Sequence, residues 1–470
     1  MSNGRKYTSD VATDFHVVFL PLPSPSHMIP LVDVARLFSA RGVRSTIVTS
    51  HHSLSLLQNH INFDLARGYP ISVHIVNIPP GKGMAYLSSL QKPIEQVVRN
   101  LDPNCIFSDM FFTWTVDLAE ELKIPRLLFY PNCLFSHSVL YSLKQHYCST
   151  IVKSKHESFV VPDLPDKITM KKSRVPDWVK LNTVLGDYFE TVLQSGKRSF
   201  GLVYNTCYEI EPAYVDHMKK SVKGTKIWHI GPLFEYFNNK NYDDCMSNKH
   251  ESLTWLDNQK PKSVIYVCFG SLTTFQEAQI TEIALALDEC DQPFVWVIRR
   301  KEDNQEGINN GLPQGFEERI RKTNKGLIIR DWAPQVEILQ HAAIGGFLTH
   351  CGWGSVLEAV VAGVPLVTWP LTADHFEIEK LVELLEIGVK VGAEVYNMSF
   401  DITSPIIEKR TIVDAIVKLQ DGSIIGENMR QNLKVLSNKV KQSVQEGGSS
   451  FNNLTGLIED IKAFEFSQNN

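Results

Sequence analysis

Residues 332–375 read WAPQVEILQHAAIGGFLTHCGWGSVLEAVVAGVPLVTWPLTADH, and this stretch decides the fold. An apolar run at 345–349 leads into a polar, glycine-rich turn, an amphipathic segment and a second apolar run at 365–369. This order predicts a strand, a turn, a helix and a strand, with the turn at the carboxyl end of the first strand. Ligands of open parallel sheets bind at that edge, and phosphates bind where a helix begins. The stretch therefore predicts a site for a phosphate-bearing ligand.

Alternating strand and helix patterns continue on both sides of this stretch. In the amino-terminal half, strands are predicted at residues 16–22, 45–50, 72–78, 104–110, 126–130 and 201–206. In the carboxyl-terminal half they are predicted at residues 263–271, 294–300, 326–330, 345–349 and 365–369. Two such series indicate an α/β protein with two facing, doubly wound domains of parallel sheet.

The domain boundaries follow from composition. We expect a first domain over 1–240 and a second over 253–450, joined by the polar, asparagine-rich linker 236–252. Residues 452–470 carry apolar side chains on one helical face after a glycine-serine hinge. This tail helix is expected to pack back on the first domain. The proline-bearing region 153–179 is expected to form loops over a cleft.

Bulk properties exclude several classes of protein. The net charge of −5 argues against nucleic-acid binding, and no apolar run is long enough to span a bilayer. No convincing signal peptide precedes the first strand. The eight cysteines include no CxxC pair, which in so long a chain favours reduced thiols and a cytoplasmic location. A chain of this size without targeting segments is expected to be a soluble, multi-domain protein.

The glycine turn at 350–355 is the strongest candidate for phosphate binding. Gly352 and Gly354 allow a ligand close to the backbone, the following helix offers free N–H groups, and His350 could donate a further hydrogen bond. Two alternatives stay open at this stage. Ser355 and Glu358 could form a helix capping box without any ligand, and His350 could be an ordinary buried histidine.

Other polar and aromatic residues stand at predicted strand ends in the second domain. Asp374 and His375 follow a strand end and suit a polyol, although Asp374 could instead cap the next helix. Trp332 lies beside Pro334 and Gln335 in a loop and could stack on a base, although a tryptophan is more often part of the core.

In the first domain, His27 and Asp109 form a candidate catalytic pair. His27 begins a helix after the first strand, and Asp109 ends the strand at 104–110. A catalytic histidine is helped by an acid that fixes its tautomer and stabilises its protonated form. The alternative is a coincidence, because any histidine and aspartate at strand ends would fit the same description.

These residues together resemble the plant family-1 UDP-dependent glycosyltransferases, enzymes of GT-B architecture with a signature nucleotide-sugar (PSPG) box. The resemblance extends over nearly the whole chain. Its motifs are HMIP at 27–30, SDMFF at 108–112, FGS at 269–271, WAPQ at 332–335 and HCGW at 350–353.

The resemblance implies a donor role for a set of residues in the second domain. The nucleoside would be bound by Trp332, Ala333, Gln335 and Glu358. The diphosphate would be bound by Ser271, His350, Gly352 and Ser355. Trp353, Asp374 and His375 would face the sugar, with Gly354 near the phosphate or sugar.

The resemblance also implies the chemistry. His27 would act as general base on an acceptor hydroxyl and Asp109 as its partner, and one displacement would invert the anomeric centre. The acceptor pocket is expected to be apolar and to include Phe111, Phe112 and Tyr130. No D-x-D motif is present, so we expect no metal and no cofactor beyond the UDP-sugar co-substrate, and we expect a monomer.

Three positions depart from the family pattern. Many relatives have asparagine at Gly354, glycine at Ser26, and, where they use glucose, glutamine at His375. In this family histidine at that last position is associated with galactose and sometimes arabinose. We therefore expect UDP-galactose first and UDP-glucose next. The expected acceptor is a triterpenoid or steroidal aglycone or its monoglycoside, with a flavonoid or other phenolic as the alternative.

Two other classes of function compete with a transferase. A dinucleotide-dependent oxidoreductase is disfavoured because no G-x-G-x-x-G stands at the first strand-helix turn. A non-catalytic small-molecule binder on the same fold is disfavoured because His27 and Asp109 are both present.

Overall fold

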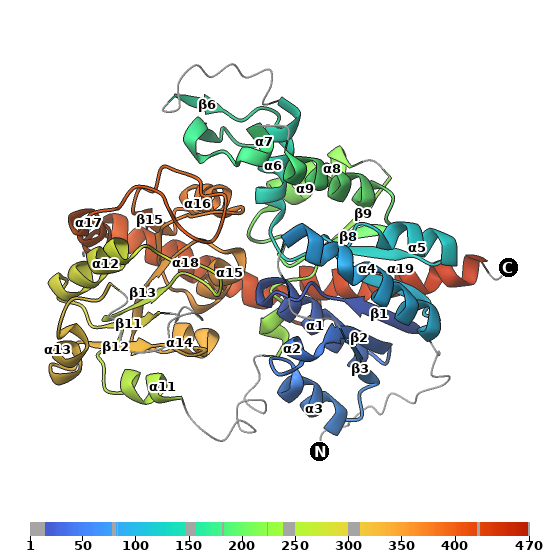
Figure 1. Ribbon diagram of the computed structural model, residues 1–470, viewed down its shortest axis with the longest axis horizontal. Coiled ribbons are helices and arrows are strands. Elements are labelled where there is room, and N and C mark those ends of the chain that lie inside the picture. Colours follow the sequence, from blue (N-terminus) through green and yellow to red (C-terminus); the bar gives the residue numbers. More distant parts are fainter. Residues whose placement is uncertain are drawn as a thin grey trace.

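Two parallel sheets, one in each half of the chain, form the framework of the molecule (Figure 1). The computed structural model describes residues 15–77, 81, 83–146, 157–180, 183–222, 224–237, 250–298, 311–420 and 424–468. Each sheet forms the centre of one lobe in Figure 1, with helices packed around it. The α/β prediction with two parallel-sheet domains is confirmed.

The first sheet has strand order β3-β2-β1-β4-β5-β8-β9, and all its pairings are parallel. Its strands are β1 (His16–Leu20), β2 (Arg44–Ser50), β3 (Ile71–Val76), β4 (Cys105–Asp109), β5 (Arg126–Tyr130), β8 (Gly201–Tyr204) and β9 (Lys226–His229). The helices of this half are α1 (Pro25–Ser39), α2 (His51–Leu54), α3 (Gln58–Ala66), α4 (Gly83–Leu101), α5 (Thr115–Leu122), α6 (Leu134–His146), α7 (Asp177–Lys180), α8 (Val184–Lys197) and α9 (Pro212–Ser221).

The second sheet has strand order β12-β11-β10-β13-β14-β15 and is also parallel. Its strands are β10 (Val264–Cys268), β11 (Phe294–Val297), β12 (Gly326–Ile329), β13 (Ile344–Thr349), β14 (Leu366–Thr368) and β15 (Gly388–Lys390). Its helices are α11 (Glu251–Leu256), α12 (Glu277–Glu289), α13 (Phe316–Lys322), α14 (Gln335–Gln340), α15 (Trp353–Ala362), α16 (His375–Leu384), α17 (Lys409–Gln420) and α18 (Ile424–Ser443).

The central strands are continuous apolar runs because both of their faces are covered. All five residues of β1 (HVVFL) and all five of β10 (VIYVC) are buried. Strands of a parallel sheet with helices on both faces show this pattern instead of alternation. The same burial explains why these strands were recognisable in the sequence.

Each sheet reverses its winding direction between two central strands. In the first sheet the reversal lies between β1 and β4, and in the second it lies between β10 and β13. Ligands of doubly wound sheets bind beyond the carboxyl ends of the strands at such a reversal. The fold therefore marks two places, one in each domain, where a site is expected.

Some elements were not predicted. β9 and β15 are four and three residues long, too short to give a recognisable pattern. The region expected to be loops contains a small antiparallel pair, β6 (Ser158–Val160) and β7 (Thr169–Lys171), and the 3₁₀ turn η1 (Lys172–Arg174). A second 3₁₀ turn, η2 (Leu233–Phe237), overlaps the start of the expected linker 236–252, most of which lies outside the described residues.

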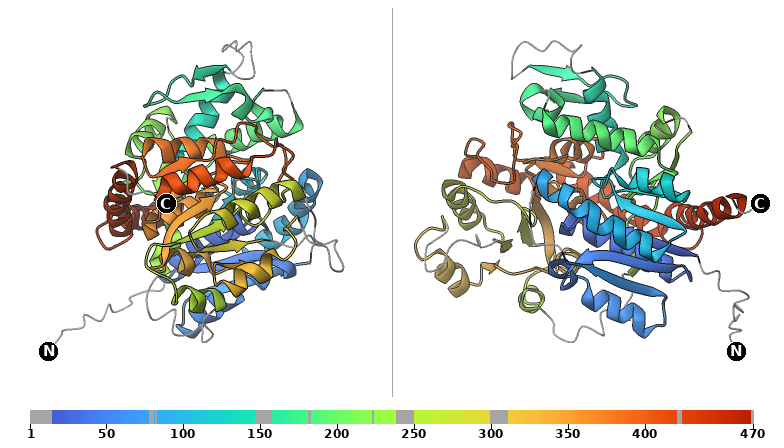
Figure 2. Two further views of the ribbon diagram at one scale, coloured as in Figure 1. Left: turned by 90° about the vertical axis from the view of Figure 1, so that its left-hand side faces the viewer. Right: turned by 45° about the vertical axis from the view of Figure 1, so that its right-hand side comes forward.

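The last helix, α19 (Ser449–Gln468), lies against the first domain (Figures 1 and 2). Its buried side chains Leu454, Leu457, Ile458 and Ile461 belong to one cluster with core residues of the first sheet. The hydroxyl of Ser450 donates to the Gly231 carbonyl at 2.6 Å. The chain thus returns from the second domain and closes over the first.

No helix among the described residues is long and apolar enough to cross a membrane. Six cysteines lie in the described part of the chain, and all six are buried and free of disulfides (Cys105, Cys133, Cys207, Cys268, Cys290 and Cys351).

Candidate active site

His27 and Asp109 meet at the winding reversal of the first sheet. Leu20 at the end of β1 pairs with Ser108 of β4, so the segments that follow these strands start side by side. The Nδ1 atom of His27 lies 2.8 Å from Oδ2 of Asp109. The Asp109 side chain is completely buried, whereas the His27 side chain keeps 18% of its exposure. The two residues form a pair whose histidine alone reaches solvent.

The pairing fixes the tautomer of His27. A carboxylate only accepts hydrogen bonds, so Nδ1 of the neutral ring carries the proton and Nε2 carries the lone pair. The other oxygen of Asp109 accepts from the Phe111 backbone N–H at 3.0 Å, which prevents the carboxylate from turning. The geometry therefore presents Nε2 of His27 as a proton acceptor at the first domain's ligand edge.

Phe111 forms an aromatic wall beside the histidine. Its ring centroid lies 5.4 Å from that of His27, and it stacks on Tyr188 at 6.2 Å. The Tyr188 hydroxyl donates to the Phe111 carbonyl. Burial raises the pKa of Tyr188 to about 12, so this hydroxyl stays protonated and keeps its donor role.

The other two residues expected in an acceptor pocket lie in the core. Tyr130 is 3% exposed and stacks on Tyr204 at 4.9 Å. Phe112 is 1% exposed and borders a cavity of only about 20 Å³, which is about the space of one water molecule. Their rings offer no open surface to an aglycone, and of the three residues only Phe111 lies beside His27.

In the second domain, His350 lies directly beyond β13 and is held between two glycines. A side-chain carbon on Gly270 would lie 2.6 Å from Nε2 of His350, and one on Gly352 would lie 2.5 Å from it. Glycine is therefore required at both positions for the ring to fit. Burial lowers the pKa of His350 to about 4, so the ring is neutral. The expectation of a buried histidine agrees with this environment, and the neutral ring can still offer one N–H.

Gln335, Ser355 and Glu358 form one hydrogen-bonded group where α14 and α15 begin. The Gln335 amide donates to Oγ of Ser355 at 2.9 Å and to Oε2 of Glu358 at 2.6 Å. The Tyr266 hydroxyl donates to the Gln335 carbonyl oxygen at 3.2 Å. Burial raises the pKa of the half-buried Glu358 to about 7, and the bond from Gln335 opposes this shift.

The capping-box alternative for Ser355 and Glu358 is wrong. α15 begins at Trp353 with Gly352 as its N-cap, and no side chain caps it. Ser355 lies inside the first helical turn, so its hydroxyl is not in the position of a cap. The N–H groups of this helix start therefore keep their capacity to bind an anion.

Asp374 connects the two domains. It stands at the N-cap position of α16, but its side chain makes no capping bond. Its carboxylate instead accepts from the hydroxyl of Ser136 at 2.9 Å and from the amide of Asn132 at 3.5 Å, both in the first domain. Burial raises the pKa of Asp374, and a charge on His27 is among the influences that lower it. The candidate sugar-binding carboxylate is thus held against the domain that carries the candidate base.

Trp353 also lies in the domain interface. Its side chain is buried, and its indole N–H donates to the Asn205 carbonyl of the first domain at 2.7 Å. The resemblance implies that Trp353 faces the sugar, and that stays a prediction. Trp353 holds the start of α15 against the first domain.

His375 follows Asp374 in the first turn of α16 and packs against His350. The ring centroids are 4.7 Å apart and perpendicular. Nδ1 of His375 accepts from the Thr372 backbone N–H at 3.3 Å. Burial, followed by the influence of His350, lowers the pKa of His375 well below its usual value, so the ring is neutral. Because Nδ1 accepts, the proton lies on Nε2, which is a donor.

The remaining predicted donor residues border the same edge. Trp332 follows β12 and is 51% exposed, so the alternative that it belongs to the core is wrong. Ala333 is half-buried beside it, and Ser271 follows Gly270 beyond β10, the strand that neighbours β13. Gly354 is exposed, and a side-chain carbon built on it would meet nothing within 4 Å.

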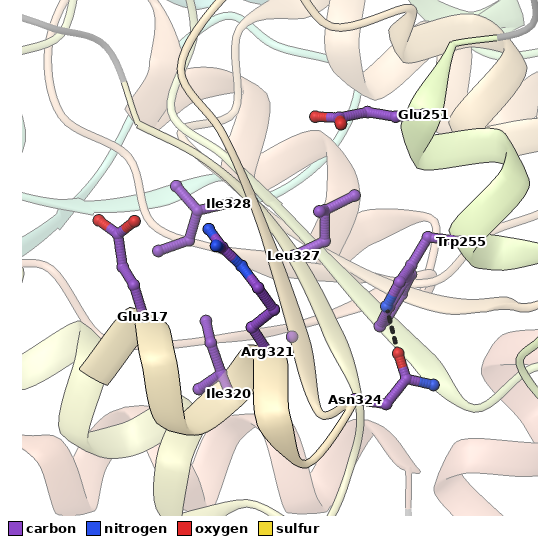
Figure 3. Close-up of a pocket in the computed structure, with 9 residues that line it drawn as sticks. Glu251, Trp255, Glu317, Ile320, Arg321, Asn324, Leu327 and Ile328 are labelled. Atoms are coloured by element: carbon purple, nitrogen blue, oxygen red, sulfur yellow. Dashed lines mark hydrogen bonds between the residues drawn. The ribbon is translucent and has the colours of Figure 1, made fainter. Parts of the chain in front are cut away.

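A separate cavity of about 230 Å³ lies on the outer side of the second domain (Figure 3). It is lined by residues of α11, α13 and β12, among them Trp255, whose indole N–H donates to the Asn324 side chain at 2.7 Å. None of the candidate site residues lines it. Within the described ranges, no group of three or more histidine, cysteine, aspartate or glutamate side chains is placed to hold a metal ion.

Several contacts of the site were not predicted. Asn132 and Ser136 follow the strand end of β5, and the strand-end argument that singled out Asp109 could have found Asn132. Asn205 contributes only its backbone carbonyl, and Tyr188 comes from a helix 77 residues after the carbonyl that it contacts. Nothing in the sequence pattern marks these two.

Comparison with known proteins decides the family. Residues 91–408 match the model for UDP-glucoronosyl and UDP-glucosyl transferase. The chain belongs to this family. It is therefore a UDP-glycosyltransferase, and its predicted membership of the plant enzymes is confirmed by relatives that match it over almost their whole length.

Two curated relatives and one crystal structure illustrate the similarity. This UDP-glycosyltransferase is 44% identical to a nuatigenin 3-beta-glucosyltransferase of Solanum aculeatissimum, over 97% of this chain and 99% of that protein. It is 38% identical to a soyasapogenol B glucuronide galactosyltransferase of Glycine max, over 96% of both chains. The structure of Glycyrrhiza uralensis UGT73P12 complexed with glycyrrhetinic acid 3-O-monoglucuronide is 35% identical, covers 97% of both chains and has a TM-score of 0.91. The similarity confirms the expected GT-B fold.

Proposed function

We propose that this UDP-glycosyltransferase transfers a hexose, with inversion, from a UDP-sugar to a hydroxyl of a small apolar plant metabolite. One observation carries the proposal. His27, oriented by Asp109 with Nε2 as its proton acceptor, lies on the domain whose Ser136 and Asn132 donate to the carboxylate of Asp374 from the other domain. A base on one domain, with a polyol-binding carboxylate of the other held against that domain, is the arrangement that direct transfer to a hydroxyl requires.

In the proposed reaction His27 acts as general base. Nε2 removes the proton of the acceptor hydroxyl while that oxygen attacks the anomeric carbon from the face opposite UDP. The new C–O bond forms as the bond to the diphosphate breaks, so an α-linked donor gives a β-glycoside. The carboxylate of Asp109, 2.8 Å from Nδ1, stabilises the imidazolium that results.

The start of α15 is proposed to stabilise the departing diphosphate. Its N–H groups carry no side-chain cap, and Gly352 at this helix start packs closely against the His350 ring. A helix N-terminus carries a partial positive charge, which matches the charge that develops on the leaving group. Together with the absence of a D-x-D motif, this supports transfer that needs no metal ion and no cofactor.

We propose UDP-galactose as the preferred donor, with UDP-glucose next. His375 is neutral and bonded through Nδ1, so it presents a single N–H donor at Nε2. A glutamine would present both a donor and an acceptor. The two sugars differ in the orientation of one hydroxyl, so a change in hydrogen-bonding pattern beside Asp374 can discriminate between them. One of the two relatives described above is named as a galactosyltransferase.

For the acceptor we propose a triterpenoid or steroidal aglycone or its monoglycoside. The aromatic wall of Phe111 and Tyr188 beside His27 is suited to a flat apolar molecule. The relatives are named for a steroidal aglycone and a triterpenoid glucuronide, and the similar crystal structure holds a triterpenoid glucuronide.

The six buried free thiols support a reducing compartment, which we propose is the cytoplasm, and we propose a monomer.

A matrix of donors and acceptors tests this function. Purified enzyme is incubated with UDP-galactose, UDP-glucose or UDP-arabinose and with triterpenoid, steroidal and flavonoid acceptors, and products are identified by mass. We expect the fastest transfer with UDP-galactose and a triterpenoid or steroidal acceptor. Faster turnover of UDP-glucose with the same acceptor contradicts the donor assignment. UDP release with none of the acceptors favours a non-catalytic binder.

A further inference from the structure

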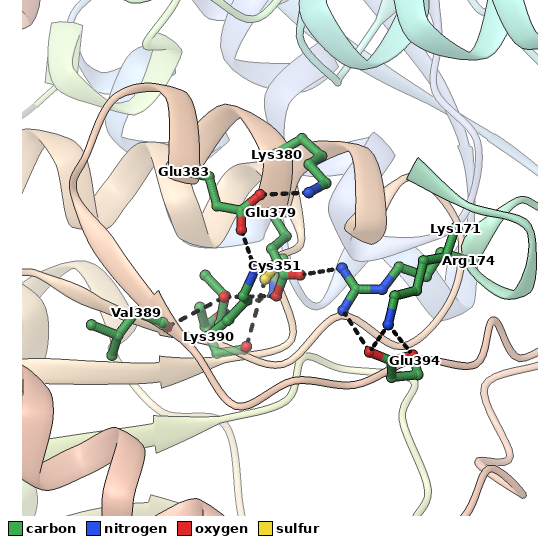
Figure 4. A network of polar contacts seen from close by, with 11 residues as sticks. Lys171, Arg174, Cys351, Glu379, Lys380, Glu383, Val389, Lys390 and Glu394 are labelled. Atoms are coloured by element: carbon green, nitrogen blue, oxygen red, sulfur yellow. Dashed lines mark hydrogen bonds and ion pairs between the residues drawn. The ribbon is translucent and has the colours of Figure 1, made fainter. Parts of the chain in front are cut away.

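A bridge of charged residues joins the two domains away from the reacting groups (Figure 4). This interdomain bridge consists of Lys171 and Arg174, at the end of β7 and in η1, and of Glu379 and Glu394 in the second domain. Nη1 of Arg174 lies 3.0 Å from Oε1 of Glu379, and Nζ of Lys171 lies 2.7 Å from Oε1 of Glu394. The Arg174–Glu379 pair is buried, with side chains 6% and 0% exposed, whereas those of Lys171 and Glu394 are 36% and 41% exposed.

Glu379 lies beside the glycine turn at 350–355. It stands one helical turn after His375 on α16, and its second oxygen accepts from the Thr368 hydroxyl at 2.8 Å, at the end of β14. Burial, followed by the charge of Glu379, raises the pKa of the Cys351 thiol well above its usual value. Figure 4 shows Cys351 beside Glu379. Cys351 is the residue between His350 and Gly352, so this carboxylate lies directly behind the proposed diphosphate site.

A buried carboxylate in this place opposes the binding of a second anion. Charges interact more strongly in the protein interior than in water, because the surroundings screen them less. Burial raises the pKa of Glu379, and Arg174 gives the largest opposing influence, ahead of the Thr368 hydrogen bond. The other charged groups that act on Glu379 are Glu383, which raises its pKa, and Lys390, which lowers it. Lys390 already pairs with Glu383 at 2.5 Å. Arg174 is therefore the main counter-charge of Glu379.

We propose that Arg174 is a positioning residue that the acceptor domain contributes to the donor site. It neutralises Glu379 behind the diphosphate turn and fixes α16, whose first turn carries His375. The donor site is then complete only when the β7–η1 segment is docked on the second domain. This inference rests on the proposed function, because it needs a UDP-sugar at this turn.

The same segment is linked to the proposed catalytic histidine through a series of ring contacts. Trp178, in α7 just after η1, stacks on Phe189 at 4.2 Å between ring centroids. Phe189 contacts Phe111 at 5.9 Å, and Phe111 contacts His27 at 5.4 Å. One short stretch of chain thus contacts the donor helix at one end and the wall beside the base at the other. Docking of the β7–η1 segment on the second domain therefore positions both α16 and the aromatic wall beside His27.

Calorimetric titration of UDP into four enzymes tests the role of the charge. Arg174→Met removes the counter-charge, and we expect the Kd for UDP to rise about tenfold or more at pH 8. Glu379→Gln can keep the oxygen that accepts from Arg174 but removes the buried negative charge, and Arg174 then has Glu394, at 3.9 Å, as its ion partner. UDP binding is therefore expected to tighten, by about threefold. The double variant is expected to return to within about threefold of the wild type.

Lys171→Met is the matched control, because it breaks the same bridge without touching Glu379. We expect its UDP affinity to stay within about twofold of the wild type. Equal losses in Lys171→Met and Arg174→Met, or a double variant weaker than Arg174→Met, overturn the inference. If Arg174→Met does not fold, the Glu379→Gln variant tests the inference alone. Weaker UDP binding in that variant contradicts the proposal that the charge of Glu379 opposes UDP. A wild-type enzyme that does not bind UDP refutes the proposed function instead.

Discussion

At the scale of single residues, the site depends on which nitrogen of each histidine carries the proton. Asp109 fixes the proton of His27 on Nδ1, and the Thr372 N–H fixes that of His375 on Nε2. The first assignment leaves Nε2 of His27 as a proton acceptor, and the second leaves Nε2 of His375 as a donor. Two residues of the same type therefore have opposite roles, which their hydrogen-bond partners determine.

Asp109→Asn tests the tautomer of His27 directly. The amide N–H would donate to Nδ1 and move the ring proton to Nε2, which leaves Nε2 without a lone pair to accept a proton. We expect kcat to fall by about 10²–10⁴, with the KM for the UDP-sugar within about twofold of the wild type. The control is Asp117→Asn, whose side chain is 69% exposed and pairs with Arg198 on the surface. A kcat equal to that of this control contradicts the assignment.

Gly354→Asn tests the donor site at a position where space is open. The added side chain meets nothing within 4 Å of its first carbon, and asparagine costs a helix no more than glycine does. We expect an unchanged melting temperature and a lower KM for the UDP-sugar, by about twofold to tenfold, because one more amide faces the phosphate or sugar. A raised KM shows that the backbone at this glycine must stay uncovered.

At the scale of elements, the starts of α14 and α15 form one unit. Gln335 of α14 donates to Ser355 and Glu358 of α15, so the residues expected to bind the nucleoside and the phosphate hold one another in place before any ligand enters. Such preorganisation lowers the ordering that binding would otherwise require. It also keeps a carboxyl group, Glu358, partly removed from water.

The raised pKa of Glu358, about 7, predicts a pH dependence of donor binding. Below this pH the carboxyl is protonated, whereas ribose hydroxyls donate to the ionised form, so binding must release the proton. The affinity for UDP-glucose should rise with pH, by up to about tenfold per unit, and level off above pH 7. UDP-glucose is used because its diphosphate does not titrate in this range. Calorimetry on Glu358→Gln should give a flat profile, and an unchanged slope contradicts the role.

Parts of this organisation were readable from the sequence for a physical reason. His27, Asp109, His350 and Asp374 follow apolar runs, and strands of a parallel sheet end at one edge, so a local pattern was enough to place them. Ser136 contacts Asp374 from 238 residues away, and Arg174 contacts Glu379 from 205 residues away. Pairs of this kind depend on how the domains dock. Local periodicity carries no information about that. The pocket roles that came with the resemblance fall, for Phe112 and Tyr130, on buried rings.

At the scale of the whole molecule, two kinds of contact hold the domains together. α19 packs on the first domain after α18 of the second, and Trp353, Asp374 and Glu379 of the second domain bond to residues of the first. The domain that carries His27 and the domain that carries Asp374 are therefore held in a defined arrangement. Transfer between two separate substrates depends on that alignment.

Leu457→Ala tests the contribution of the tail helix to stability. Leu457 is completely buried among core residues of the first sheet. Removing its side chain should lower the free energy of unfolding by about 2–5 kcal/mol, from lost burial and the cavity that remains. Val435→Ala on α18, 44% exposed, should change it by no more than about 0.5 kcal/mol. Denaturant melts of both variants measure the difference, and equal values would show that α19 is dispensable for the fold.

The central claim is that one molecule binds the donor with its second domain and activates the acceptor with His27 of the first. The most direct measurement compares UDP binding and sugar transfer in His27→Ala. We predict that the Kd for UDP stays within about twofold of the wild type while kcat falls by about 10²-fold or more. Transfer retained within about tenfold, or a loss of UDP binding in parallel with transfer, would contradict this division of roles.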